Sequence, residues 1–224
     1  MTDSPTTLGP GIRTFKPRRS RITARAQQAL VDHAGLMLPV DVPLDLGATW
    51  GDDVPVVLEI GCGDGRATVE MAVADPETGI LAIDVHTPGL GELLARAGDA
   101  HVTNVRVMEG DAIAVLEGQV PVGALAGVRS YFPDPWPKAR HHKRRLVQPA
   151  VVDLVRSRLR LHGYWHLATD WAEYAEVMLE CFGADPRWSG GVIERPAWRP
   201  VTRYETRALG EGRPVVDLLL TRIA

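Results

Sequence analysis

The chain has 224 residues, of which 45% are hydrophobic and 24% charged, as is usual for a soluble globular protein with a sizeable core. This composition excludes a disordered or collagen-like chain, and no apolar run approaches the ~18 residues that a membrane-spanning helix needs. The net charge of −3 argues mildly against a nucleic-acid partner, but the charge is unevenly distributed. It is +4 over residues 1–40, −12 over 41–117, +7 over 118–162 and −2 over 163–224. Such segregation predicts a polarised surface that steers charged ligands, although basic segments are more often simply solvated.

Residues 1–19 contain proline, glycine and threonine but lack the apolar stretch of a signal peptide. We predict a flexible basic tail here, followed by one domain over residues 20–224. The two cysteines, Cys62 and Cys181, lie far apart and show no metal-like spacing, which favours a reducing compartment. These features predict a cytoplasmic protein with no membrane partner.

Short apolar runs alternate with helical stretches from Val54 onward. The first run, residues 54–60, is rich in β-branched residues and ends in glycines, as expected for a strand buried on both faces of a parallel sheet. The helix predicted over 146–161 has Pro149 in its first turn and Gly163 as its stop. This alternation predicts a doubly wound α/β sheet. The other predicted strands are 80–85, 105–108, 128–132, 164–168 and 215–221, the last a candidate antiparallel addition, and the other predicted helices are 66–74, 88–99, 111–117 and 171–182.

A doubly wound sheet binds ligands at the carboxyl ends of its strands, where this chain has glycines and carboxylates. The loop EIGCGDGRA, residues 59–67, contains Gly61, Gly63 and Gly65, which permit a tight turn and a close approach of a ligand to the backbone. The third glycine comes one residue earlier than in the dinucleotide-binding fingerprint GxGxxG. The spacing GxGxG behind an acidic residue resembles instead the first motif of Rossmann-like methyltransferases that use S-adenosylmethionine (SAM). Taken alone, the glycines equally fit an unrelated tight turn.

Carboxylates at the next strand ends strengthen the case for SAM. Asp84 ends the second predicted strand, where it can accept hydrogen bonds from both hydroxyls of a ribose. Asp111 follows the third strand, where it or its backbone neighbours can read an adenine amino group. Glu59 is expected near the amino-acid end of the cofactor, where its charge offsets the positive charges of the ligand. The alternative is that each acid caps the helix that follows it, which carries most weight for Asp111.

The most specific segment is YFPDPWPKARHHKRRL, residues 131–146. Asp134 follows the fourth strand, and Pro135 and Pro137 fix φ on either side of Trp136. A rigid turn with a carboxylate and an aromatic ring suits the floor of a site for a flat base, although DPWP also fits a merely stiff turn. The basic side chains that follow suit contact with phosphates, and the two histidines lack the spaced partners of a metal site. These side chains are Lys138, Arg140, His141, His142, Lys143, Arg144 and Arg145.

FPDPWPKARHHKRR and EIGCGDG together resemble the bacterial tRNA (guanine-N7)-methyltransferase family. Four further segments match in family order, namely SRITARAQQAL from Ser20, VHTPGLGELL from Val85, ATDW from Ala168 and TRYE from Thr202. The resemblance implies a mostly parallel, seven-stranded Rossmann-like methyltransferase sheet with helices on both faces. It implies SAM as methyl donor, S-adenosylhomocysteine as product, no metal, and tRNA as the partner, methylated at N7 of the guanine at variable-loop position 46. No obligatory protein partner is evident.

The resemblance also implies roles for individual residues. Asp134 takes the catalytic position, and Asp84 stands where the family more often has glutamate, which shortens its reach toward the ribose but keeps its charge. The residues expected to bind the cofactor are Glu59, Gly61, Gly63, Gly65, Asp84, Asp111 and Asp134. The residues implied to bind the substrate are Lys138, Asp170, Thr202, Arg203, Tyr204 and Glu205, and those implied to contact RNA are Arg140, His141, His142, Lys143, Arg144 and Arg145.

Guanine N7 carries an available lone pair at neutral pH, so no proton must be removed before methylation, and the protein contributes mainly orientation and electrostatics. We expect Asp134 to stabilise the methylated purine and Asp170 or Glu205 to accept from the guanine N1–H and amino groups. Trp136 or Tyr204 is expected to stack on the unpaired or flipped base. Two other functions fit parts of the sequence: a SAM-dependent methyltransferase of another substrate, and a non-catalytic RNA-binding protein. The first leaves the basic run unexplained, and the second leaves the acids and glycines unexplained.

Overall fold

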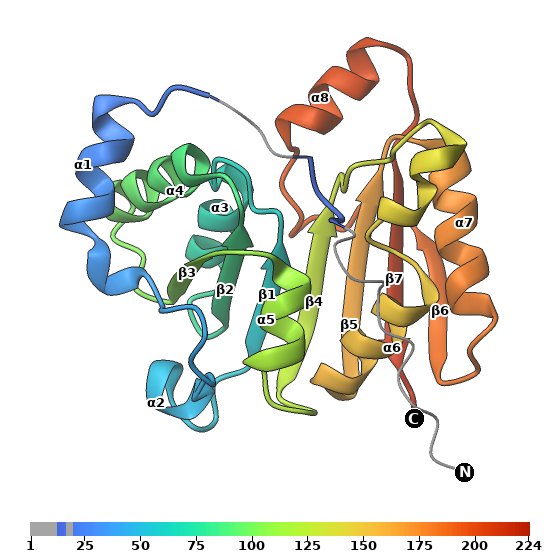
Figure 1. The fold of residues 1–224 in the computed structure, drawn as a ribbon, viewed down its shortest axis with the longest axis horizontal. Helices are drawn as coiled ribbons and strands as arrows, with labels where there is room; N and C mark the ends of the chain where they lie inside the picture. Colours follow the sequence, from blue (N-terminus) through green and yellow to red (C-terminus); the bar gives the residue numbers. More distant parts are fainter. Residues whose placement is uncertain (1–12, 17–19) are drawn as a thin grey trace.

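The computed structural model describes residues 13–16 and 20–224, which fold around a seven-stranded sheet (Figure 1). Its strands are β1 (Val56–Ile60), β2 (Gly79–Asp84), β3 (Val105–Glu109), β4 (Leu125–Tyr131), β5 (Leu159–Thr169), β6 (Trp188–Ile193) and β7 (Val216–Arg222). They lie side by side in the order β3-β2-β1-β4-β5-β7-β6. The first five pair in parallel, whereas β7 runs antiparallel to both β5 and β6. The predicted α/β class, the seven strands and the antiparallel last strand are confirmed.

Helices pack on both faces of this sheet (Figure 1). One face carries α1 (Ala24–Asp32), α3 (Arg66–Ala74) and α4 (Thr87–Asp99), and the other carries α5 (Ala112–Gly118), α6 (Pro149–Arg158) and α7 (Ala172–Gly183). The remaining helical elements are η1 (Ala34–Leu36), α2 (Leu46–Trp50), η2 (Ala139–Arg144) and α8 (Arg203–Gly210). None of the helices in the described part of the chain is long and apolar enough to cross a membrane.

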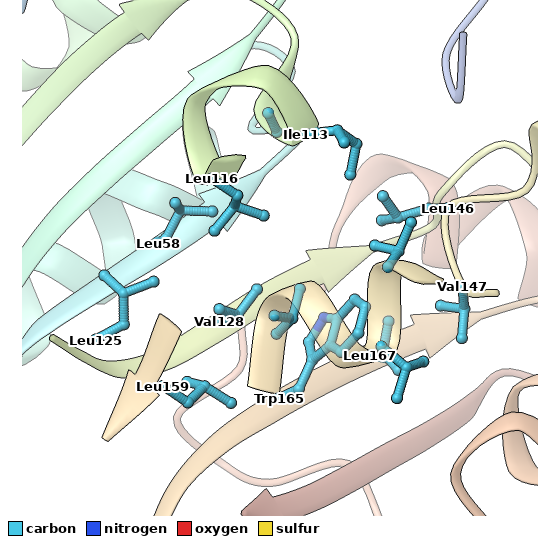
Figure 2. Close-up of a cluster of buried hydrophobic side chains, with 14 of the residues drawn as sticks. Leu58, Ile113, Leu116, Leu125, Val128, Leu146, Val147, Leu159, Trp165 and Leu167 are labelled. Atoms are coloured by element: carbon cyan, nitrogen blue, oxygen red, sulfur yellow. The ribbon is translucent and has the colours of Figure 1, made fainter. Parts of the chain in front are cut away.

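Two apolar clusters fill the space between the sheet and its helices. Figure 2 shows the cluster on the side of α5 and α6, where Val128 and Leu167 lie beside the fully buried Trp165 and Leu58 lies next to Leu116. The other cluster packs Ile80 and neighbouring strand residues against α4. Because successive strand residues point to opposite faces, a strand covered on both sides must be apolar throughout, which explains the uninterrupted runs in the sequence.

The boundary between α6 and β5 differs from the prediction of a helix over 146–161. Pro149 begins the helix, but the chain becomes extended at Leu159, with ψ of 141°, and β5 starts there. Gly163 therefore does not end a helix. It lies in β5, where the register with β4 shifts, and an added Cβ would lie 2.9 Å from the Arg160 carbonyl oxygen. The residues at 159–161 continue the apolar spacing of the helix, and this made the boundary invisible in the sequence.

The tail predicted over residues 1–19 falls mostly outside the described residues. The four that are described, 13–16, lie against the carboxyl ends of the strands, and Thr14 is buried there. This short segment therefore belongs to the surroundings of the cavities at that edge of the sheet.

Candidate functional site

Two adjoining cavities lie at the carboxyl ends of β1, β2 and β4. The first is bordered by Asp84, Asp111 and Asp134, and the second by Glu59 and the first residues of α8. Figure 1 shows α8 beyond the carboxyl ends of β4 and β5. The residues that border both cavities are Gly61, Gly63, Tyr131 and Tyr204. The fold thus gathers at one place Gly61, Gly63 and all four acids that were predicted to bind a cofactor, whereas Gly65 borders neither cavity.

The glycines of the loop after β1 have two different roles. Gly61, Gly63 and Gly65 all have left-handed backbone, with φ of 78°, 63° and 70°, which disfavours any other residue. An added Cβ at Gly65 would lie 2.2 Å from Leu93 Cγ and 2.7 Å from its Cα, so this glycine lets α3 pack against α4. A Cβ at Gly61 or Gly63 would meet no atom within 4 Å, because these two positions face the open cavities.

Asp84 and Asp111 are each held by the backbone while they border the first cavity. Asp84 accepts from the Gly63 N–H through Oδ2 (2.9 Å) and from the His86 N–H through Oδ1 (3.0 Å). Asp111 caps α5 by accepting from the Ile113 N–H (3.0 Å). A carboxylate has about four lone-pair sites, so each acid retains capacity for a ligand. Asp111 therefore both caps α5 and borders the cavity, so the two roles considered for it are compatible.

Glu59 is the buried acid of the second cavity. Its residue is 4% exposed, and within the described part of the chain its Oε2 atom has no hydrogen-bond partner. Burial raises the pKa of the Glu59 carboxyl, and this rise is opposed first by the neighbouring Thr68 hydroxyl and then by the positive charge of Arg129, its register partner on β4. A buried acceptor without a partner is costly, so its presence at a cavity indicates a ligand that donates to it.

Asp134 stands in a strained turn between β4 and η2. Phe132 and Trp136 both have left-handed backbone, with φ of 56° and 46°, a conformation that costs about 1–3 kcal/mol for such residues. The Phe132 N–H donates to the Ala168 carbonyl oxygen (2.7 Å), which fastens the turn to β5. Asp134 Oδ2 accepts from the Lys16 N–H (2.9 Å), so residues 14–16 form the wall of the first cavity at this carboxylate.

Most of the basic residues after Asp134 lie in the 3₁₀ helix η2, which Lys138 and Arg145 flank. Lys138, Arg140, Lys143 and Arg144 are exposed, and His141 and His142 are half-buried. The Arg144 guanidinium lies 5.1 Å from the centre of the Trp136 ring, which ties the exposed cations to the turn that carries Asp134. This exposed group is well placed for the predicted contact with a phosphate backbone.

Arg145 corrects the prediction that the whole basic run contacts RNA. Its side chain is 2% exposed and donates to both carboxylate oxygens of Glu173 (2.9 and 2.5 Å) and to the Pro135 carbonyl oxygen (2.9 Å). Its guanidinium also lies 4.7 Å from the centre of the Tyr174 ring. Arg145 therefore holds the Asp134 turn against α7 and is not available to a partner.

The predicted substrate-binding residues fall into two groups. Tyr204 borders both cavities, with its ring stacked on Phe132 at 6.0 Å between centroids, and Thr202 and Arg203 border the second cavity. Lys138 and Asp170 border neither cavity, and Asp170 forms an ion pair with Arg213. The pattern Thr-x-x-Glu at 202–205 is a capping-box signature, which predicts that a helix begins here. In the structure Thr202 is the N-cap of α8, and its Oγ1 accepts from the Glu205 N–H (3.2 Å).

Glu205 faces the protein interior instead of the cavities. It is 5% exposed, and its carboxylate forms ion pairs with Arg199 (2.7 Å) and with Arg195 (3.3 Å). We expected Glu205 to accept hydrogen bonds from guanine, but its carboxylate is already paired with two arginines.

Sequence reasoning missed a group of buried polar side chains that we call the buried array. Arg199 donates to both carboxylate oxygens of Asp217 (2.6 and 2.8 Å), and Asp217 Oδ1 lies 2.8 Å from His166 Nε2. His166 Nδ1 lies 3.0 Å from the Tyr131 hydroxyl. A neutral imidazole protonated at Nε2 satisfies both contacts, so the partners assign this tautomer. The array consists of Tyr131, His166, Asp217, Arg199 and Glu205; single polar residues inside the apolar runs YWHLAT and VVDLLLT were its signal in the sequence.

His166 makes the stability of the fold depend on pH. Burial lowers the pKa of its imidazole below the ordinary value of 6.5, with Arg199 and Arg129 contributing and Asp217 opposing. As the pH falls through about 6.5 the unfolded chain takes up a proton at this residue while the folded chain does not, so the free energy of unfolding is full above that pH and declines below it. We expect the Tm to fall between about pH 7.5 and 5.5, and to fall less steeply in His166→Gln, whose amide can still donate to Asp217. Calorimetric scans with equal slopes for both proteins would contradict this assignment.

Comparison with known proteins gives the family of the chain. Residues 53–218 match a family model described as "Putative methyltransferase". The chain is 50% identical over 220 residues to a tRNA (guanine-N(7)-)-methyltransferase of Streptomyces avermitilis, a match that covers 95% of this chain and 76% of the relative. It is 44% identical over 220 residues to the enzyme of that name from Aeromonas hydrophila, covering 95% of this chain and 92% of the relative.

Solved structures agree with the fold. An rRNA methylase from Streptococcus thermophilus superposes with a TM-score of 0.53 at 14% identity, over 92% of this chain and 100% of that one. The 16S rRNA (adenine(1408)-N(1))-methyltransferase from Catenulisporales acidiphilia, solved with SAM as cosubstrate, gives a TM-score of 0.53 at 16% identity, over 76% of this chain and 86% of that one. These likenesses confirm the Rossmann-like methyltransferase sheet, and the identity to the named relatives goes further: the chain belongs to the tRNA (guanine-N(7)-)-methyltransferase family.

Proposed function

We propose that this chain transfers a methyl group from SAM to N7 of the guanine at variable-loop position 46 of tRNA, leaving S-adenosylhomocysteine. The observation that carries the proposal is the position of Asp134. It borders the same cavity as Gly61, Gly63 and the two strand-end acids, and the exposed basic residues of η2 follow directly in the chain. A cofactor pocket, a carboxylate and a cationic surface thus adjoin one another, as methylation of a nucleic-acid base requires.

The residues of the two cavities fit SAM. Glu59 supplies a buried, unpaired carboxylate oxygen that can accept from the ammonium group of the amino-acid end. Asp84 borders the first cavity, where it can accept from ribose hydroxyls, and Gly61 and Gly63 let the ligand approach the backbone. When bound, SAM supplies an electrophilic methyl group on a positively charged sulfur.

The chain's own residues orient the guanine. N7 has an available lone pair, so we assign Asp134 to electrostatic stabilisation of the methylated purine and to positioning, with no role as a general base. Of the two aromatic residues expected to stack on the base, Tyr204 borders the cavity and Trp136 lies with the cations of η2. We retain Asp170 as the candidate acceptor for the guanine N1–H, because its pair with Arg213 is partly exposed.

We propose that residues 20–224 form one methyltransferase domain that acts on tRNA in the cytoplasm. The sheet and both helical layers lie within that range. Residues 14–16 add a wall to the cavity at Asp134. Lys138, Arg140, Lys143 and Arg144 form the exposed surface assigned to the phosphate backbone, where contacts set affinity and position without reading the base sequence.

Neutralising two exposed cations of η2 tests the RNA-binding surface. In the double variant Lys143→Gln and Arg144→Gln we expect weaker tRNA binding, with the slope of log K against log salt reduced by about 1 for each phosphate that the protein no longer neutralises. Arg145→Gln is the matched control, because Arg145 belongs to the same run but is buried. Because its partner Glu173 is half exposed, that control is expected to lose about 2 kcal/mol, as for a hydrogen bond to a charged group, which lowers the Tm by about 4–8 °C and leaves the salt slope unchanged. A double variant with the wild-type salt slope would remove η2 from the RNA-binding surface.

A tRNA with 7-deazaguanine at position 46 tests the assignment to N7. This base carries a C–H group in place of N7, so we expect no methyl transfer to it, while binding to the enzyme persists. The control tRNA carries 7-deazaguanine at another guanine outside the variable loop and is expected to be methylated normally. Equal transfer to both modified tRNAs would overturn the assignment.

A further inference from the structure

The buried array contains four side chains to which the proposed reaction assigns no role: Arg199, Asp217, His166 and Glu205. None of them borders either cavity, and all are almost completely buried. A cluster of this kind is costly to bury unless every member is paired. The array reaches the site at two points, because His166 contacts Tyr131 and Glu205 lies on α8.

Arg199 is the centre of this array. Its guanidinium donates to both carboxylate oxygens of Asp217 on β7 and to Glu205 on α8 (2.7 Å), and it has no exposed surface. The same group lies 5.5 Å from the centre of the Tyr131 ring at the end of β4. One side chain thus contacts two strands and α8 at once.

The helix that Arg199 holds buries few of its own residues. In the eight residues of α8, only Glu205 and Ala208 are buried, and Leu209 is mostly exposed. So little apolar burial cannot by itself fix a short helix. The ion pair of Glu205 with Arg199 is the buried fastening of α8. The pairs of Arg195 with Glu205 (3.3 Å) and of Arg203 with Asp64 (3.9 Å) involve more exposed side chains and add less.

The start of α8 carries the part of the site that this fastening controls. Tyr204 borders both cavities and stacks on Phe132, and the helix cap Thr202 borders the second cavity. Tyr131 borders both cavities from the opposite element, β4, and the array reaches it through the Arg199 contact and through His166. The array therefore ties together two walls of the same site.

We propose that Arg199 and Glu205 are positioning residues for the methylation reaction: Arg199 clamps Glu205 to Asp217 and thereby fixes Tyr204 relative to Tyr131 across the site. Glu205 acts through Arg199 and does not touch the guanine. The expected effect on kcat rests on the proposed function, whereas the effect on the position of α8 can be measured independently of that function. If the clamp is loosened, a smaller fraction of the enzyme has Tyr204 in its place beside the cavities, and kcat falls. The η2 surface keeps its affinity for tRNA.

Two variants separate positioning from contact with the base. Glu205→Gln removes one charge but keeps a hydrogen-bond acceptor for Arg199, and the remaining pair of Arg199 with Asp217 stays neutral overall, so the variant is expected to fold. Asp217→Asn weakens the same clamp from β7, at a residue that borders neither cavity. Arg195→Gln is the matched control, because Arg195 reaches the same Glu205 carboxylate from the exposed side.

The experiment measures kcat, the Kd for tRNA and amide hydrogen exchange over α8. We expect both Glu205→Gln and Asp217→Asn to lower kcat about tenfold or more, the loss that corresponds to one weakened charge-assisted hydrogen bond, with the Kd for tRNA within about twofold of wild type. Amides of α8 are expected to exchange faster in both variants and those of α4 to be unchanged, and Arg195→Gln is expected to behave as wild type. Combining the two substitutions is expected to add little to either one alone, because both act on one clamp.

A loss of kcat in Glu205→Gln with normal kcat in Asp217→Asn would overturn the inference, since it would show that Glu205 contacts the substrate directly. Faster exchange of α8 without a loss of kcat, or no change in either readout, would overturn it as well. If the wild-type protein itself fails to methylate tRNA, the proposed function fails, and the exchange of α8 amides in the two variants then decides whether the clamp exists.

Discussion

Replacement of Asp134 with asparagine is expected to lower kcat for methyl transfer by about a hundredfold or more, the usual effect of removing one preorganised electrostatic contact. The asparagine keeps the size of the side chain and an oxygen that can accept from the Lys16 N–H, so the turn between Phe132 and Trp136 is expected to survive. What it loses is the negative charge beside the purine that becomes positive on methylation. Single-turnover transfer of labelled methyl to unmodified tRNA measures the effect.

Binding of tRNA to Asp134→Asn is expected to stay within about twofold of wild type, because phosphate contacts on η2 dominate affinity. Asp153→Asn is a suitable control, since this partly exposed carboxylate lies on α6 and borders neither cavity. Turnover at the wild-type rate in Asp134→Asn would remove the Asp134 carboxylate from the mechanism. A parallel loss of tRNA binding would instead indicate that the turn had collapsed, which the Tm reports independently.

Replacement of Glu59 with glutamine is expected to raise the Kd for SAM by about tenfold to a hundredfold, the equivalent of about 1.5–3 kcal/mol for a hydrogen bond to a charged group. The Glu59 carboxylate is buried at the second cavity with Oε2 unpaired. Water therefore cannot replace the interaction with the ligand that is lost when the charge is removed. Titration calorimetry with SAM and with S-adenosylhomocysteine measures the change. Both ligands carry the ammonium group, so we expect equal losses for the two.

Glu70→Gln is the matched control for Glu59, because it makes the same substitution at an exposed position of α3. Its affinity for both ligands is expected to equal that of wild type. A loss confined to SAM would assign Glu59 to the positive sulfur instead of the ammonium group. Wild-type affinity for both ligands in Glu59→Gln would show that this carboxylate does not face the cofactor.

The cofactor half of the site could be predicted from the sequence because its signals are local. Gly61, Gly63 and Gly65 follow a strand at fixed spacing, and Asp84 and Asp111 stand at the ends of the next two strands, which the fold places on one edge. Strands that are apolar throughout indicate a parallel sheet covered on both faces, and the carboxyl ends of parallel strands lie at one edge of the sheet. Six of the seven strands were predicted for the same reason, whereas β6 was missed because its sequence, WSGGVI, lacks an apolar run.

The substrate half was harder to predict because tertiary partners decide the fate of each side chain. Arg145 and Arg144 are neighbours in one basic run, but Glu173 and Pro135 bury the first and leave the second exposed. Glu205 likewise turns inward because Arg199, six residues earlier, lies beneath α8. The buried array joins Tyr131 of β4 and His166 of β5 to Asp217 of β7, residues that are far apart in sequence, and no local pattern brings them together.

The central claim, methylation of guanine N7 in tRNA, is tested most directly by mapping the methyl group. The full chain is incubated with labelled SAM and unmodified tRNA, and the modified nucleotide is located by cleavage at 7-methylguanosine and by mass spectrometry of the fragments. We expect a single labelled product, 7-methylguanosine at position 46 of the variable loop. Label on another atom or another position, or a SAM-binding protein that transfers no methyl group to tRNA, would contradict the account.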